Sequence, residues 1–394
     1  MSEGASEIRR GRQCMSQQGK LGAQIIKGTN LPFAAGCLWF RFHSETPNSL
    51  TFDSYLACVR DSLSAIEGVQ NIELHHKFEY WNVSDSNQLV PMSEGGEPFP
   101  DLTGSVFTAS FGLKVPEGFV RDYVGSAPYE LVVGQSYSVL IGERQFGPYA
   151  IVLCLDSTNS PTGAFSLVEN YIRKSLESQH SPFALDSPVR SPIPIHFSMQ
   201  PMENIGPTLR VYPRSDSYIP TFIVSYDSGN FATPIDAFKV LFETFGFEVA
   251  LHFECVRVTE RLSKEWLEIL GHTGELASLL QKSGIRGWLS RLTGLGKRAV
   301  ALRLGIVAIE LREISDISHL EALVRVFHST PAPYLLTSST QQVLDDPRPS
   351  NSAQYSRVVT VAEQIHSRAV EFRSLLLAAL VGAGGGLLVS LLTR

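Results

Sequence analysis

Two short acidic segments follow predicted strands and are the first places to look for chemistry. Their sequences are Asp156-Ser-Thr-Asn159 and Asp227-Ser-Gly-Asn230. Carboxylates that follow a strand lie where many α/β proteins bind ligands. The same residue types are also common helix N-caps and turn formers. Two interpretations therefore stay open, a dispersed active site between two domains and a purely structural role.

Other signatures of catalysis or metal binding are missing from the sequence. It contains no GxxxxGK[ST] phosphate loop, no HExxH and no GxSxG. His75 and His76 are adjacent, and neighbours on a strand point to opposite faces, which does not suit a shared metal ion. The five cysteines form no CxxC pair. We therefore expect no metal and no cofactor, and interaction more readily than catalysis.

A basic segment lies between Glu275 and Glu310, where six cations and no acidic residue occur. Within it, Ile285, Trp288 and Leu292 have the spacing of one helical face, which is typical of a helix that lies on an anionic membrane surface. The residues that we expect to contact a membrane surface or another anion are Lys282, Arg286, Trp288, Arg291, Lys297 and Arg298. The alternative is a helix whose apolar face joins the core. The net charge of −6 argues against nucleic acid as a partner.

The last segment with a distinctive pattern is the C-terminal stretch 374–393, which holds 20 residues without a charge. A helix of this length spans about 30 Å, the thickness of the hydrocarbon core of a bilayer. Small residues recur every fourth position in it, at Ala378, Gly382, Gly386 and Ser390. Such a row lets two membrane helices pack closely. The sequence therefore predicts a single transmembrane helix that self-associates, with a buried helix of a soluble fold as the alternative.

The segment before this stretch continues the same helix. A heptad seam runs through it, with alternating spacings of three and four residues. Its members are Tyr355, Val358, Ala362, Ile365, Ala369, Phe372, Leu376, Ala379 and Ala383. We expect a self-associating helical stalk over 353–373, or otherwise an amphipathic helix that packs on its own domain.

Elements that would position these residues can be predicted from the hydrophobic periodicity. A strand at 36–42, a helix at 51–66 and a strand at 72–80 suggest a βαβ unit. Strands at 105–115, 129–134, 136–142 and 149–156 and a helix at 162–178 follow. The eight prolines between residues 181 and 220 exclude helix and central strands, so we expect a connector there.

A second domain is expected after the prolines. It begins with a strand at 221–226 and a helix at 234–245, in which Pro234 stands near the first turn. Alternating residues predict a strand at 247–255, and a nearly continuous apolar run predicts a buried strand at 300–310. Helices are expected over 261–293 and, from a capping-box pattern, over 318–328.

The predicted fold class is α+β, with two mixed soluble domains, a stalk and a transmembrane helix. The expected divisions are a flexible tail 1–34, an α+β domain 35–179, a connector 180–219, a second α+β domain 220–330, a linker 331–352, the stalk 353–373 and the span 374–393. We expect a membrane protein whose N-terminal bulk is cytoplasmic, a homo-oligomer that contacts membrane lipid and a protein or ligand partner. A membrane-tethered enzyme remains the alternative.

Overall fold

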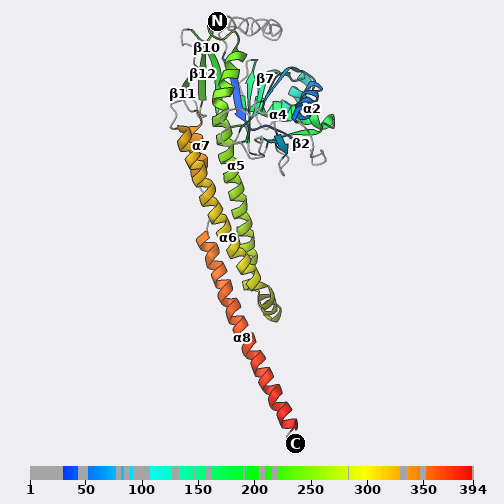
Figure 1. Cartoon of the computed structure of the whole chain (residues 1–394), viewed down its shortest axis with the longest axis vertical. Coiled ribbons are helices and arrows are strands. Elements are labelled where there is room, and N and C mark those ends of the chain that lie inside the picture. Colours follow the sequence, from blue (N-terminus) through cyan, green and yellow to red (C-terminus); the bar gives the residue numbers. More distant parts are fainter. Residues whose placement is uncertain are drawn as a thin grey trace, which may run out of the picture. The chain divides into compact units, whose positions relative to one another are not determined.

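The computed structural model divides the chain into two compact units. The sheet unit comprises Met1–Val256 with Pro331–Thr340, and the helical unit comprises Arg257–Thr330 with Gln341–Arg394. The structure describes residues 30–42, 52–76, 81–83, 89–91, 107–126, 133–144, 147–156, 161–187, 189, 191–203, 209–214, 221–282, 284–328, 335–346 and 352–392. Within these ranges the chain is a mixed α/β protein with one large mixed sheet (Figure 1). The predicted α/β character is therefore confirmed.

Eight strands form the large sheet of the sheet unit, in the order β11-β12-β10-β1-β8-β7-β6-β3. All neighbours are antiparallel except β10 and β12. The strands are β1 (Leu31–Gly36), β2 (Trp39–Phe42), β3 (Val69–His76), β4 (Trp81–Val83), β5 (Leu89–Pro91), β6 (Phe107–Lys114), β7 (Ser136–Arg144), β8 (Gly147–Cys154), β9 (Phe183–Asp186), β10 (His196–Met202), β11 (Arg210–Arg214) and β12 (Thr221–Asp227). Two small sheets pair β2 with β9 and β4 with β5.

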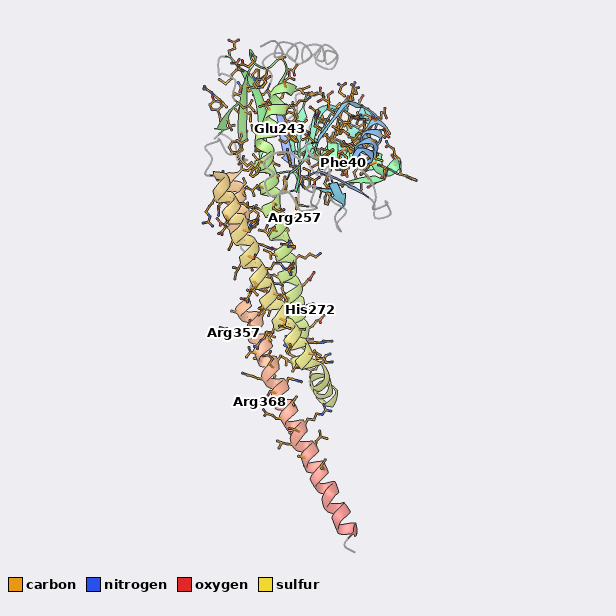
Figure 2. The ribbon with its side chains drawn as sticks, viewed as in Figure 1. Phe40, Glu243, Arg257, His272, Arg357 and Arg368 are labelled. Carbon is orange, nitrogen blue, oxygen red and sulfur yellow. The ribbon has the colours of Figure 1, made fainter. Side chains whose placement is uncertain are left out.

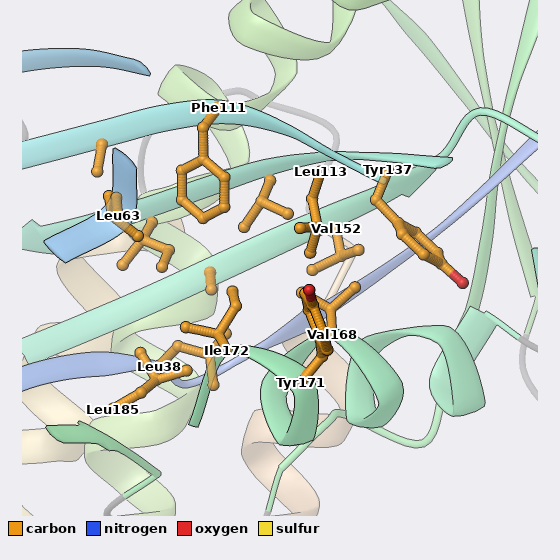
Figure 3. Close-up of a cluster of buried hydrophobic side chains, with 14 of the residues drawn as sticks. Leu38, Leu63, Phe111, Leu113, Tyr137, Val152, Val168, Tyr171, Ile172 and Leu185 are labelled. Atoms are coloured by element: carbon orange, nitrogen blue, oxygen red, sulfur yellow. The ribbon is translucent and has the colours of Figure 1, made fainter. Parts of the chain in front are cut away.

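One face of the large sheet is covered by helices from the first half of the chain. They are α2 (Phe52–Ser64), α3 (Glu117–Ser126) and α4 (Pro161–Ser178). Side chains such as Leu63, Val168 and Ile172 meet Phe111 and Val152 of the sheet in a single buried cluster (Figure 3). The apolar stripes of α2 and α4 recur at helical spacing, which explains why both helices were predicted nearly to the residue.

The opposite face is covered by the first half of α5 (Pro234–Gln281). Phe238, Phe242 and Phe245 pack there against Phe33 and Phe197 of the sheet. The centre of the sheet is therefore covered by helices on both faces. Because β8 lies there, it is almost continuously apolar and shows little alternation between buried and exposed positions.

The structure corrects three predictions in the sheet unit. The strand expected at 36–42 is split into β1 and β2, and β1 takes up the end of the predicted tail. The expected βαβ unit is interrupted, since β8, β7 and β6 lie between β1 and β3. The proline-rich connector contributes β9, β10 and β11, and β10 is an interior strand. Its only proline, Pro201, lies next to its last residue, so the ladder loses few hydrogen bonds.

The helical unit contains the second half of α5, α6 (Gly284–His328) and α8 (Ser352–Leu392). The short α7 (Thr337–Asp345) lies in the predicted linker 331–352. The strands predicted at 247–255 and 300–310 are wrong, because both segments are helical, in α5 and α6. The helix predicted at 318–328 is the end of α6. One continuous helix over the predicted stalk and span is confirmed as α8.

Candidate functional site

The helical unit has its own core, built where three helices meet. Trp266 of α5 is fully buried, its ring lies 5.9 Å from that of Tyr355 in α8, and its indole nitrogen donates to Glu313 of α6 at 2.9 Å. The remaining core side chains are Ile269, Leu276, Leu279, Leu295, Ala299, Leu302, Ile306, Ile309, Val359 and Ala362. This hydrogen bond and the ion pairs Arg261–Asp316 and Arg312–Glu265 together hold α5 in register with α6.

Small residues bring α6 and α8 close together. Ala299 and Ala362 are both fully buried between the helices. A Cβ atom added at Gly296 would stand 2.4 Å from the ring of His366, so glycine is needed for this approach. Arg303 of α6 forms an ion pair with Glu363 of α8 at 2.9 Å. These contacts set the two helices antiparallel along much of their shared length.

The first half of the heptad seam predicted in α8 packs against other helices of the same chain. Tyr355 and Ala362 belong to the buried core, and Val358 and Ile365 pack against it. For these positions the packing matches the alternative of a helix on its own domain. The polar positions Arg357 and Arg368 of the same helix are exposed (Figure 2).

Beyond this packed half, the described apolar side chains of α8 are exposed. Phe372 is 54% exposed, Leu375 is 69% exposed and Val381 is 73% exposed. Ala378, the first member of the predicted small-residue row, is also exposed. Gly382, Gly386 and Ser390 belong to α8, and their side chains lie outside the described part of the structure.

Among the described residues, no helix is both long enough and apolar enough to cross a bilayer.

The predicted basic patch surrounds the turn between α5 and α6. Lys282 follows the last residue of α5, and Lys297 and Arg298 lie further along α6; all three are exposed. Arg286, Trp288 and Arg291 lie in the first turns of α6, and their side chains are outside the described set. The structure thus places all six residues on one connected helix–turn–helix segment.

An exposed apolar face of α6 was missed by the sequence analysis. We call it the α6 seam, and it consists of Val300, Leu304, Val307, Leu311 and Ile314. The first three of these residues were assigned to the buried strand predicted at 300–310. Its spacings of four, three, four and three residues are a heptad pattern. Counting apolar positions at helical spacing, and not only at strand spacing, would have found it.

The acidic segments of the sheet unit have structural roles. The Asp156 carboxylate accepts hydrogen bonds from the backbone N–H groups of Gln135 and Ser136, both at 2.8 Å. Asp227 accepts the N–H of Gly229 at 2.8 Å. Among the described residues no three His, Cys, Asp or Glu side chains are grouped as metal ligands. The hydrogen bonds of Asp156 and Asp227 match a structural role, and the candidate helix cap at Asn159 lies outside the described residues.

A buried polar cluster on α5 holds the segment that leads into α7, and no sequence pattern pointed to it. The Glu248 carboxylate accepts the backbone N–H of Leu335 at 2.9 Å and also that of Leu336. One turn further along α5, His252 Nδ1 lies 3.2 Å from Thr340 Oγ1. Burial raises the pKa of Glu248 to about 7, against the lowering effect of those N–H groups, and lowers the pKa of His252 to about 4.

Comparisons with protein-family models, with curated proteins and with solved structures find no match for this chain.

Proposed function

We propose that this chain is an interaction protein, which associates with copies of itself and is held at a membrane by the end of α8. The proposal keeps the anchor predicted over 374–393 and the contact of the basic patch with anionic lipid. The observation that supports it most is the position of the basic patch along the helix axis, where α6 runs beside the part of α8 in which the uncharged stretch begins.

The antiparallel packing of α6 on α8 fixes that position. Gly296 of α6 lies beside His366 of α8. Moving ten residues toward the start of α6 therefore moves about ten residues toward the end of α8, since both helices rise 1.5 Å per residue. Arg286 and Arg291 then lie level with residues 371–376, where the uncharged stretch begins. Cations at this level suit the headgroup region of a membrane that α8 enters.

The exposure of the α8 side chains supports the same interpretation. Phe372, Leu375, Leu377 and Val381 all have more than half of their surface exposed. Each large apolar residue buried in lipid contributes about 1.5–3 kcal/mol relative to water. A helix end of this composition needs an apolar environment, and the flanking Arg368 and Arg373 are placed to meet headgroups.

The sheet unit supplies the binding part of the proposal. Asp156 and Asp227 hold backbone amides in place, and the buried Glu248 and His252 hold the segment that leads into α7. This arrangement favours a binding module for a protein or ligand over an enzyme. The cytoplasmic side is proposed for it because Arg368 and Arg373 precede the span on that side.

Alkaline carbonate extraction of membranes tests the anchor. We expect the full chain to stay in the pellet and a truncation after Glu371 to be released. A double variant, Leu377→Arg/Val381→Arg, should be released in large part, because an arginine at the centre of a span costs about 2.5–3.5 kcal/mol. The matched control is Val361→Arg/Val370→Arg, which changes similarly exposed valines before the span. Equal behaviour of all four proteins would refute the anchor.

Crosslinking of full-length protein in membranes tests self-association through the small-residue row. Gly382→Leu/Gly386→Leu should reduce the crosslinked dimer, since leucine separates the two backbones. Gly384→Leu lies about half a helical turn from this row and should leave the dimer unchanged. If both variants crosslink like the native chain, the row is not the contact.

A further inference from the structure

The α6 seam is a surface that the described residues of this chain leave exposed. Its five residues, Val300, Leu304, Val307, Leu311 and Ile314, are between 45% and 66% exposed. The opposite face of the same helix is buried in the core through Leu302, Ile306 and Ile309, so α6 is apolar on two sides.

The size of this surface sets it apart from scattered exposed side chains. From their exposed fractions, the five residues together expose on the order of 500 Å², the size of the largest apolar patch on a typical monomer, which is often a functional surface. The strip runs along about four turns of helix with no charged side chain within it. A regular strip of this kind fits another helix better than it fits a small molecule.

We infer that the α6 seam binds the α6 seam of a second copy of this chain, with the two helices parallel. This inference deepens the proposed function, because it names a surface of the helical unit for the self-association proposed there. Two copies whose α8 helices enter one membrane have their α6 helices pointing the same way. Parallel pairing is then the arrangement that the anchor permits.

The heptad composition agrees with a parallel assembly. Leu304 and Leu311 occupy a positions, and the β-branched Val300, Val307 and Ile314 occupy d positions. Leucine at a with β-branched residues at d favours parallel bundles of more than two strands. We therefore expect pairs to be the smallest unit, with trimers or tetramers formed through the same strip.

The residues that flank the seam are compatible with this packing. Ala301 and Ala308 stand at e positions, where small side chains let a second helix with its own neighbours approach. Arg303 and Glu310 stand at g positions and in a parallel pair face Ala308 and Ser315 of the other copy. No like charges are therefore brought together across the strip.

The area is sufficient for a contact that a membrane assists. Two seams bury about 1,000 Å² in total, at the lower limit for a specific interface. Attachment to one membrane raises the effective concentration of the copies, so an interface of this size suffices.

Cysteine crosslinking of the full-length chain tests the inference and its direction. Val300→Cys and Ile314→Cys lie at the two ends of the seam. In a parallel pair each residue meets its own counterpart, so both variants should give covalent dimer on mild oxidation. We expect yields about ten-fold above those of Leu267→Cys, an equally exposed position on α5, because the seam holds the thiols together. The unchanged chain controls for its native cysteines.

Antiparallel pairing gives a different result. It would join Val300→Cys to Leu311→Cys in a mixture, while each variant alone would stay monomeric. That pattern overturns the parallel arrangement, and the absence of any dimer above the Leu267→Cys level overturns the seam as a self-contact.

A charge-insertion pair keeps the test independent of thiol chemistry. In a chain that also carries Gly382→Leu/Gly386→Leu, which removes the proposed contact between α8 helices, Leu304→Glu/Leu311→Glu should lower the mass in mild detergent toward the monomer, as measured by light scattering. Leu267→Glu/Leu270→Glu makes the same change at exposed leucines of α5 and should keep the oligomer. Loss of the oligomer in both, or in neither, overturns the inference.

Carbonate extraction separates failure of the seam from failure of the anchor. A seam variant that is monomeric but still extracts with the membrane leaves the anchor intact. A chain that is soluble yet still crosslinks at Val300→Cys refutes the anchor and supports the seam.

Discussion

Glu248 and His252 make opposite contributions to how the stability of the sheet unit depends on pH. Burial raises the pKa of Glu248 to about 7, so its proton is held more tightly in the folded chain than in the unfolded one. The stabilisation from that proton is complete below about pH 4.5 and is lost as the pH rises through 7. Burial lowers the pKa of His252 to about 4, and its contribution is complete above about pH 6.5 and is lost as the pH falls through 4.

Each shift is about 2.5 pKa units from the ordinary value, which corresponds to about 3 kcal/mol at 1.36 kcal/mol per unit. The two slopes have opposite signs and overlap between about pH 4.5 and 6.5. Their effects on the unfolding free energy should therefore nearly cancel in the native chain. Replacing either residue should therefore reveal the dependence of the unfolding free energy on pH that the other residue causes.

Urea unfolding of the full chain from pH 4.5 to 8 measures this balance. Relative to the native chain, Glu248→Gln should become more stable by about 3 kcal/mol as the pH rises, because the native chain must bury an ionised carboxylate. His252→Asn should become less stable by about 2–3 kcal/mol over the same range, because the native chain gains from a neutral histidine. Asparagine keeps a partner for Thr340, so the hydrogen bond is not the variable.

The reasoning is refuted if both differences are independent of pH. Equal slopes of the same sign would also refute it, since they would report a general change in charge and not these two groups. Other carboxylates titrate in all three proteins and cancel in the differences.

Two further predictions concern α5. Gly246→Ala should lower the unfolding free energy by about 1–3 kcal/mol in spite of better helix propensity, since the added Cβ would stand 2.2 Å from Tyr149. Gly271→Ala has open space and should raise it by about 1 kcal/mol, so urea melts in which both variants gain alike would contradict the packing. Asp236→Ala removes the capping box in which Asp236 accepts the N–H and hydroxyl of Thr233. A loss of about 1 kcal/mol is expected, and an unchanged melt would argue against this cap.

The parts of the fold with a clean local period were predictable. The strand β6 alternates buried and partly exposed residues, and α4 repeats an apolar face, so both were found close to their observed bounds. Pro234 was expected near a first helical turn and begins α5. In each case the local pattern and the tertiary environment agree.

The part of α5 that packs on the sheet unit shows where local reasoning fails. Phe247, Val249, Leu251 and Phe253 alternate with other residues and suggested a strand. In the structure this part of α5 is buried on nearly all sides. Apolar residues at every second position therefore cannot distinguish a strand from a helix here. The hydrogen bonds from Leu335 and Leu336 to Glu248 join residues 87 and 88 positions apart, and no local pattern encodes them.

The error at 300–310 has a different cause and bears on function. We expected a strand that is apolar and buried on both faces. The segment is apolar on two opposite faces, but it is a helix. The chain buries one face, through Leu302, Ile306 and Ile309, and leaves Leu304 and Leu311 exposed. Leaving such a strip in water forgoes roughly 25 cal/mol for each Å² of apolar surface. The apolar residues on this second face of α6 therefore favour contact with another helix, which the described part of one copy does not provide. The α6 seam of a second copy has the same heptad spacing and can provide it.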